Sequence, residues 1–126
     1  MTGDAPLVLV ADDADDILAL VEATLSRAGY EVLSARDGEA ALDLIGKRRP
    51  SVAVLDVSMP KLDGLEVLRR IRDDPALADL PVVLLSARAQ EADIELGYAL
   101  GASTYVRKPF SPRELASIVR ELLANA

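Results

Sequence analysis

Short runs of aliphatic and β-branched residues recur five times along the chain, over residues 7–10, 31–34, 52–55, 81–85 and 103–106. Runs such as VAVL and PVVLL are apolar at successive positions, so a strand that they form would bury both of its faces. The pattern therefore predicts the strands of a sheet that helices cover on both sides.

The segments between these runs have the period of amphipathic helices. The clearest lies near the C-terminal end, where four apolar residues have the spacing of one buried stripe: Leu115, Ile118, Val119 and Leu122. Ser111, Pro112 and Glu114 come before it as an N-cap, a proline at the first helical position and a capping-box acid. These residues predict a helix that begins after Ser111.

A second stripe follows the first run and predicts one buried helix face: Ile17, Leu20, Val21, Leu25 and Ala28. Gly29 is the expected C-terminal cap of this helix. Asp37 and Asp63, each followed by a glycine, mark the starts of two more helices, and Asp63 has capping-box spacing with Glu66. Because strands and helices alternate, the sequence predicts an α/β fold, a (βα)5 doubly wound sheet of five parallel strands.

The length of the chain predicts one domain. A chain of 126 residues is long enough to bury a core and too short for two domains of ordinary size. We expect residues 1–126 to form this single domain, with residues 1–6 as a loose N-terminal tail. No apolar run approaches the roughly 18 residues that a membrane-spanning helix needs, and the N-terminus lacks the features of a secretion signal. We therefore expect a cytoplasmic protein.

Composition and charge exclude several classes of function. Hydrophobic residues make up 51% of the chain but aromatic residues only 3%, which indicates a core of Val, Leu, Ile and Ala. The net charge of -7 argues against direct binding of nucleic acid by this domain. The chain has no cysteine and no histidine, so disulfides, thiolate metal sites and Ser-His-Asp or Cys-His catalysis are excluded.

Polar residues follow four of the predicted strands at the point where each strand ends. Asp12 and Asp13 follow the first strand, Asp56 ends the third, Ser86 ends the fourth and Lys108 lies just beyond the fifth. In an open parallel sheet, ligands bind outside the carboxyl ends of the strands. We therefore expect these side chains to meet at one edge of the sheet.

The acidic residues of this set suit a Mg²⁺ ion, which prefers oxygen ligands and uses one or two carboxylates. Asp13 and Asp56 would be direct ligands, and Asp12 would hold a coordinated water. The alternative is that Asp12 and Asp13 lie in a solvated loop or cap the next helix. Asp15 and Asp16 are assigned to the first turn of that helix, where the helix dipole favours acids.

Each remaining polar group has a functional and a structural interpretation. Asp56 closes a wholly apolar strand and needs a cation or hydrogen-bond donors, although it could simply cap a turn. Lys108 could form a surface ion pair, but Pro109 after it allows a cis peptide bond that would aim the lysine. Ser86 offers a hydroxyl donor or is a turn residue. Together, a carboxylate nucleophile, a divalent ion, a lysine and a hydroxyl are the parts of a phosphoryl-transfer site with an aspartyl phosphate product.

The motifs VADD, VLDVSMPKLDG, LLSA and GASTYVRKPF occur in this order and closely resemble the receiver domains of two-component response regulators, with the chemotaxis regulator as the single-domain example. The resemblance runs from about Leu7 to the last predicted helix. It implies a flavodoxin-like fold with the strand order 2-1-3-4-5. It also implies a phosphorelay receiver that is phosphorylated by a histidine kinase or a phosphotransfer protein.

The resemblance assigns a role to each matching residue. Asp56 matches the phosphoacceptor, Asp12 and Asp13 match the Mg²⁺ acids, and the backbone carbonyl of Ser58 would complete the protein ligands of the metal. The remaining matches are Lys108, which would hold the phosphoryl group, Ser86 and Tyr105, which would form the switch, and Pro109, which would follow a cis peptide bond. Without the resemblance, Tyr105 would be interpreted as an amphipathic residue of an edge strand.

Two further expectations come from the same resemblance. Ser58 and Arg88, each two residues past a matched site residue, flank the path of the hydrolytic water in the family, so their identities should set the lifetime of the phosphoryl group. Switching would change the surface formed by the last two helices and the last strand, and a homodimer could form through that surface.

Two alternative functions stand beside this one. The first is a small Mg²⁺-dependent phosphohydrolase that acts through an aspartyl phosphate, for which the DVSMP motif offers only a serine where a second acid would be needed. The second is an interaction module that keeps the fold without being phosphorylated, which the loss of an acid or the lysine would indicate. Because the set of acids and lysine is complete, we expect a receiver and not a conventional turnover enzyme.

Overall fold

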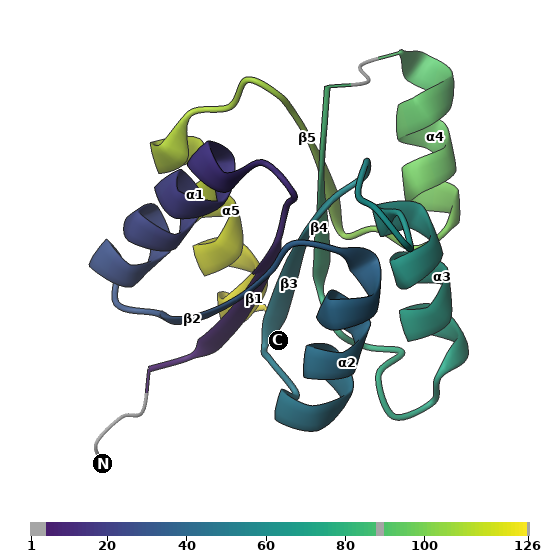
Figure 1. The fold of residues 1–126 in the computed structure, drawn as a ribbon, viewed down its shortest axis with the longest axis horizontal. Helices are drawn as coiled ribbons and strands as arrows, with labels where there is room; N and C mark the ends of the chain where they lie inside the picture. The colour runs from purple at the N-terminus through teal and green to yellow at the C-terminus, as the bar shows by residue number, and fades with distance from the viewer. Residues whose placement is uncertain (1–4, 88–89, 126) are drawn as a thin grey trace.

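The fold is a five-stranded parallel sheet with helices on both faces (Figure 1). The computed structural model describes residues 5–87 and 90–125. The strands are β1 (Leu7–Ala11), β2 (Glu31–Ala35), β3 (Val52–Asp56), β4 (Val82–Ser86) and β5 (Thr104–Arg107). The helices are α1 (Asp15–Arg27), α2 (Gly38–Arg48), α3 (Gly64–Asp73), α4 (Glu91–Ala99) and α5 (Pro112–Ala124). The strand order β2-β1-β3-β4-β5 confirms the predicted (βα)5 fold and its order 2-1-3-4-5.

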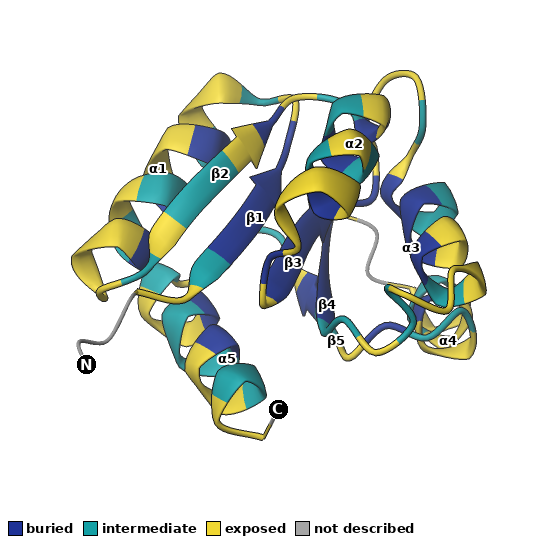
Figure 2. Cartoon of the chain, turned by 90° about the horizontal axis from the view of Figure 1, so that it is seen from below, coloured by how far each residue is buried: buried dark blue, intermediate teal, exposed yellow. Residues whose placement is uncertain are grey.

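The side chains of the central strands alternate between two apolar cores. Val8 and Val10 of β1 face α1 and α5, whereas Leu9 and Ala11 belong to the core beneath α2 and α3. All five residues of β3 and all five of β4 are buried, and Figure 2 shows β1 and β3 enclosed between the helices. Burial on both faces confirms the interpretation of the continuous apolar runs.

The predicted helix ends are confirmed by their hydrogen bonds. The side chains of Asp37, Asp63 and Ser111 each accept a hydrogen bond from the backbone amide three residues later, as N-caps do. Gly29 has a φ of +101° just after the C-cap of α1, and the amide of Tyr30 donates to the carbonyl of Leu25. Helix α1 therefore ends in a Schellman motif, which needs the left-handed conformation that glycine adopts easily.

The predicted buried stripe of α1 was wrong at two positions. Leu20 is 44% exposed, and Leu18 is buried in its place together with Val21 and Leu25. Successive helical residues turn by about 100°, so Leu18 shares the face of Val21 while Leu20 points away from it. Ala28 is also exposed, because it is the C-cap at the end of the helix.

The strands end one residue later than the sequence pattern predicted. Asp56 and Ser86 are the last residues of β3 and β4, and Asp56 pairs in register with Leu85. Pro81 precedes β4 instead of beginning it, since it has no amide to donate, although its carbonyl accepts a hydrogen bond from Ala53. The ladder hydrogen bonds therefore hold the backbone of two of the candidate site residues.

The predicted tail covers residues 1–6, of which 1–4 lie outside the described residues. The carbonyl of Pro6 accepts a hydrogen bond of 3.0 Å from the amide of Glu31, next to the first pair of the β1–β2 ladder. Across residues 5–87 and 90–125, none of the helices combines the length and the apolar character that crossing a membrane requires.

Gly46 gives a test of the helical conformation of α2 at an exposed position. It lies on the exposed side of the helix, and a Cβ built on it would meet nothing within 4 Å. We expect Gly46→Ala to raise the free energy of unfolding by about 0.5–1 kcal/mol, because alanine loses less backbone entropy in a helix. Urea unfolding measures this. Gly101→Ala should do the opposite, because Gly101 has a φ of +104° and its Cβ would lie 2.8 Å from Nε of Arg72. An unchanged or lower stability of Gly46→Ala would contradict this description of α2.

Candidate functional site

The sheet brings the predicted site residues to one edge because its parallel strands all end there. β1 and β3 are neighbours, so Asp12 and Asp13, just after β1, lie beside Asp56 at the end of β3. One carboxylate oxygen from each of the three lies within 4.8 Å of the others. Asp12 and Asp56 are buried and Asp13 is exposed. The carboxylates thus form a cluster that is open to solvent on the side of Asp13.

Lys108, which directly follows the edge strand β5, places its ammonium in this cluster. Its ammonium lies 2.9 Å from Oδ2 of Asp12 and 3.1 Å from Oδ1 of Asp56. Its amide donates a hydrogen bond of 2.8 Å to the carbonyl of Ser86, which continues the β4–β5 pairing to the lysine. Lys108 is therefore not a surface ion pair but a half-buried cation between two buried acids.

The hydrogen bonds of Asp12 exclude one interpretation of this residue, that it caps the next helix. Its Oδ1 accepts a hydrogen bond of 3.0 Å from the amide of Ala14, and its Oδ2 accepts from Lys108. The N-cap residue of α1 is Ala14, which has no side-chain cap, so neither Asp12 nor Asp13 caps the helix. Asp15 and Asp16 lie in the first turn of α1, as predicted. Asp12 instead ties the start of the loop to the lysine.

The pKa values of Asp56 and Lys108 are both raised, although burial by itself acts on them in opposite directions. Burial raises the pKa of Asp56, the negative charges of Asp12 and Asp13 add to this, and the hydrogen bond from Lys108 only partly offsets it. Burial alone would lower the pKa of Lys108, but the hydrogen bonds and charges of Asp12 and Asp56 outweigh it, so the pKa is raised and the side chain stays an ammonium. Three carboxylates against one ammonium leave an excess of negative charge.

This excess of charge, together with the donor set, fits a Mg²⁺ ion. The three acids offer the hard oxygen ligands that Mg²⁺ prefers, and the exposed side of Asp13 leaves room for the waters that the ion keeps. A divalent cation there would offset the burial and the repulsion from Asp12 and Asp13 that together raise the pKa of Asp56. The residues present therefore suit the metal.

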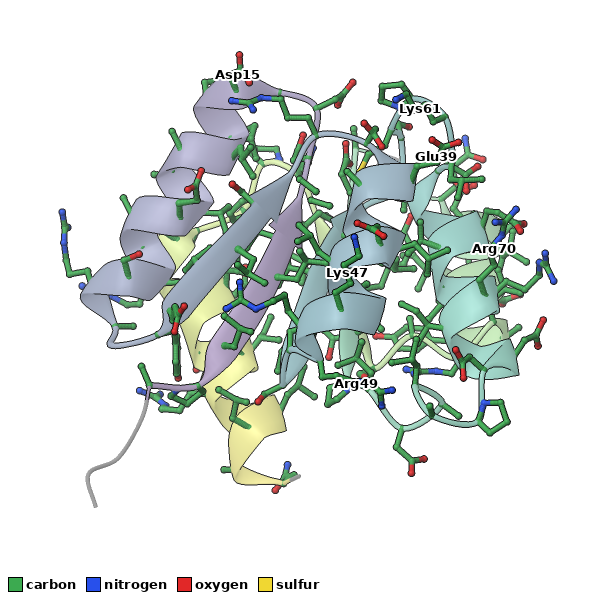
Figure 3. All side chains as sticks on the ribbon, turned by 60° about the horizontal axis from the view of Figure 1, so that its bottom comes forward. Asp15, Glu39, Lys47, Arg49, Lys61 and Arg70 are labelled. Carbon is green, nitrogen blue, oxygen red and sulfur yellow. The ribbon has the colours of Figure 1, made fainter. Side chains whose placement is uncertain are left out.

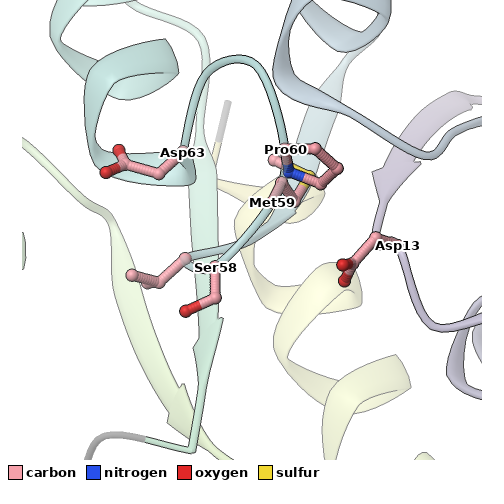
Figure 4. A pocket seen from close by; sticks show the side chains of 6 residues that line it. Asp13, Ser58, Met59, Pro60 and Asp63 are labelled. Carbon is pink, nitrogen blue, oxygen red and sulfur yellow. The ribbon is translucent and has the colours of Figure 1, made fainter.

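A pocket of about 460 Å³ opens beside the carboxylates. Asp13 lines it on one side, and Ser58, Met59, Pro60 and Asp63 of the loop between β3 and α3 line the other (Figure 4). Sequence reasoning did not single out Met59 and Pro60. The signal was their place in the loop directly after Asp56, which must border any ligand on that carboxylate.

A glycine holds this loop against the strand end. A Cβ on Gly64, the first residue of α3, would lie 2.3 Å from the carbonyl oxygen of Asp56. The amide of Gly64 donates a hydrogen bond of 2.8 Å to the carbonyl of Val57. Any larger residue at this position would push the start of α3 away from Asp56.

The remaining predicted residues lie on β4, on β5 and in the loop after β5. Ser86 is buried at the end of β4, and its register partner on β5 is Arg107. Tyr105 is half-buried and packs against the core beneath α2 and α3. The Lys108-Pro109 peptide bond is cis, as predicted. Arg88 lies outside the described residues.

The rim of this edge carries ion pairs that are exposed or partly exposed. Arg36 binds Asp15 at 2.6 Å, and Lys61 lies 3.8 Å from Asp37. Figure 3 shows Asp15 and Lys61 at this edge and Arg49 at the opposite end of the molecule. Exposed pairs of this kind contribute little to stability, so they border the site without holding it together.

Comparison with known proteins agrees with this geometry. The profile of the response regulator receiver domain matches residues 8–120. The alkaline phosphatase synthesis transcriptional regulatory protein PhoP of Bacillus subtilis is 43% identical over 119 residues, which cover 94% of this chain and 49% of that protein. The probable transcriptional regulator ycf27 of Cyanophora paradoxa is 46% identical over 116 residues, covering 92% and 47%. The chain thus spans about half the length of these relatives.

Solved structures show the same fold. The receiver domain of Francisella response regulator 1452 superposes with a TM-score of 0.90 at 35% identity, covering 95% of this chain and 98% of that one. The chemotaxis response regulator CheY4 of Vibrio cholerae gives a TM-score of 0.89 at 33% identity, covering 95% and 100%.

The chain is thus a parallel α/β domain with three carboxylates and one lysine ammonium gathered at the carboxyl ends of its strands. The chain belongs to the family of response regulator receiver domains, the receiving component of two-component systems.

The raised pKa of Asp56 predicts how stability depends on pH without metal. A carboxyl group whose pKa is higher in the folded state stabilises the fold below its ordinary pKa of about 3.9, and this contribution is lost as pH rises through the raised value. Metal-free Asp56→Asn should therefore be more stable than the wild type at pH 7, and the difference should shrink toward acidic pH. Urea unfolding at several pH values measures it. Asp43→Asn, an exposed control, should change stability by less than about 0.5 kcal/mol at any pH. A less stable Asp56→Asn at pH 7 would contradict the argument.

The cluster also predicts the effect of Mg²⁺ on stability. A metal that binds only the folded state raises the melting temperature. We expect Mg²⁺ to stabilise the wild type and to stabilise Asp13→Asn much less, since the neutral amide oxygen of asparagine is a weaker ligand for Mg²⁺ than a charged carboxylate. Asp16→Asn is the matched control, because Asp16 lies in α1 outside the cluster and should keep the full response. Thermal unfolding with and without Mg²⁺ decides, and equal responses of the two variants would rule out Asp13 as a ligand.

Proposed function

We propose that this receiver accepts a phosphoryl group on Asp56 from a histidine kinase or a histidine phosphotransfer protein. The observation that carries the proposal is the ammonium of Lys108, which lies 2.9 Å from Asp12 and 3.1 Å from Asp56 in a cluster of three carboxylates. This arrangement has a nucleophile, a fixed positive charge and a metal-type acid set within reach of one bound anion.

The transfer itself requires little of the protein beyond position and charge. A carboxylate oxygen of Asp56 attacks the phosphorus of a phosphohistidine whose second ring nitrogen carries a proton. The phosphorus–nitrogen bond breaks, and the imidazole leaves with the electron pair as a neutral ring that keeps this proton. The nucleophile needs no general base, because the acid is ionised when it attacks. Lys108 then exchanges its contact with Asp56 for an oxygen of the phosphoryl group.

Receiver domains generally use Mg²⁺ at their acidic pocket, and here Asp12, Asp13, Asp56 and the backbone carbonyl of Ser58 would hold it. The ion would neutralise the charge of the phosphoryl group during transfer. Of these residues, Asp13 and Ser58 line the open pocket, which supports entry of the phosphodonor from that side.

Phosphorylation would then be reported through Ser86 and Tyr105. New phosphoryl oxygens attract hydrogen-bond donors, so the Ser86 hydroxyl turns toward Asp56 and Tyr105 moves into the space that it leaves. The pairing of Ser86 with Arg107, two residues after Tyr105, supports this connection. The surface of α4, β5 and α5 would change as a result, and a homodimer could form through it.

The output is the process that the phosphorylated receiver would control. The two relatives named above are transcriptional regulators, and we propose an output of the same class. The net charge of -7 supports a receiver that does not itself bind nucleic acid. It assists its own phosphorylation and slow dephosphorylation without being a conventional turnover enzyme.

Phosphorylation with a small donor tests the proposal. In Mg²⁺ and acetyl phosphate, the mass of the wild-type protein should rise by one phosphoryl group, while Asp56→Asn should stay unmodified. Asp43→Asn, which removes an exposed carboxylate on α2, should be modified like the wild type. Beryllofluoride with Mg²⁺ should also shift the NMR signals of Tyr105 in the wild type and not in Asp56→Asn.

Three outcomes would count against it. A modified Asp56→Asn would remove Asp56 from its role. Release of many equivalents of phosphate per protein would favour the phosphohydrolase. A wild type that accepts no phosphoryl group and ignores beryllofluoride would favour the unphosphorylated interaction module.

A further inference from the structure

Helix α4 is held less firmly than the other helices. Its buried position among Glu91–Ala99 is a glycine, Gly97, whereas the other helices each bury aliphatic side chains. Leu96 and Tyr98 are 48% and 49% exposed. Few apolar contacts therefore fix α4 to the sheet, so single contacts decide where it lies.

Two consecutive residues of α4 touch Tyr105. A Cβ on Gly97 would lie 2.8 Å from Cδ2 of the Tyr105 ring, so the ring packs directly against the helix backbone. The hydroxyl of Tyr98 accepts a hydrogen bond of 3.2 Å from the amide of Tyr105. Since β5 is the edge strand, an amide on its outer side has no strand partner, and the Tyr98 hydroxyl takes that place.

The C-terminal end of α4 is tied down by a different and stronger set of bonds. Nε and Nη2 of Arg72, on α3, donate to the carbonyl of Gly101 at 3.0 and 2.8 Å. Nη1 donates to the carbonyls of Leu80 and Ala78 at 2.6 and 3.0 Å. Arg72 thus joins the loop before β4 to the turn before β5.

Two attachments can be compared, the hydrogen bond of the Tyr98 hydroxyl to β5 and the bonds of Arg72 to the turn after α4. The bond of the Tyr98 hydroxyl is the weaker one. It is one neutral hydrogen bond on a half-exposed side chain, whereas the guanidinium of Arg72 makes four charge-assisted bonds. A shift of the Tyr105 ring displaces the helix backbone that it packs against, and with it the adjacent Tyr98.

We propose that Tyr98 is a positioning residue for Tyr105. The hydrogen bond that the Tyr98 hydroxyl accepts holds α4 and β5 in the unphosphorylated arrangement and sets how readily the domain switches. This inference rests on the proposed function. A contact made in only one of two states stabilises that state, so its removal moves the equilibrium toward the other state. Removing the hydroxyl therefore favours switching.

Tyr98→Phe tests this, because it keeps the ring and removes only the hydroxyl. The full chain is titrated with beryllofluoride at saturating Mg²⁺, and the NMR ring signal of Tyr105 reports switching, because the Tyr105 amide loses its own hydrogen-bond acceptor in the variant. We expect the signal to move already without ligand, and the half-maximal beryllofluoride concentration to fall by about two- to tenfold, the range that one neutral hydrogen bond gives. Tyr30→Phe, the same change in the turn between α1 and β2, should leave both unchanged.

The midpoint separates a positioning role from a merely structural one. A variant that is only less stable loses the same free energy in both states and keeps the wild-type midpoint. An unchanged or higher midpoint for Tyr98→Phe, with a responding wild type, would overturn the inference and leave the proposed function standing. A wild type in which no signal responds to beryllofluoride would overturn both.

Discussion

The site depends on one buried arrangement of charge, the ammonium of Lys108 between the carboxylates of Asp12 and Asp56. Two buried acids side by side are unfavourable, and the lysine is what makes their burial tolerable. The compensation is incomplete, because the pKa of Asp56 is still raised. The domain therefore keeps an electrostatic cost at the residue that a metal ion or a phosphoryl group would change. A cation bound beside Asp56 would lower this cost.

The interactions that stabilise the fold also position the residues of this arrangement. Asp56 and Ser86 are the last residues of fully buried strands, so ladder hydrogen bonds and aliphatic packing position their backbones. Gly64 lets α3 begin directly against the carbonyl of Asp56. The buried centre of the sheet thus positions two of the candidate site residues, whereas α4 beside the edge strand has few buried contacts.

Particular elements show how far sequence reasoning reaches. The strand runs, the N-caps at Asp37, Asp63 and Ser111, and the gathering of acids at one edge followed from local patterns and the geometry of parallel strands. Leu20 was misplaced because Leu18 and Leu20 are equally apolar, and only the packing of α1 on the sheet selects which of them faces inward. The resemblance to receiver domains supplied the strand order, which periodicity does not contain.

Local patterns in the sequence determined which segments are strands and helices, where the helices begin, and which polar residues lie at strand ends, because these follow from interactions within a few residues. Only the tertiary structure decided which partners those residues have. Lys108 and Asp12 are 96 positions apart, and Arg72 binds the carbonyl of Gly101 from 29 positions away. Such contacts depend on how the helices and strands pack together. The hydrogen-bond partners of backbone carbonyls and tyrosine hydroxyls cannot be identified from a pattern of residue types. The acids of the site could therefore be predicted from the sequence, whereas the attachments of α4 could not.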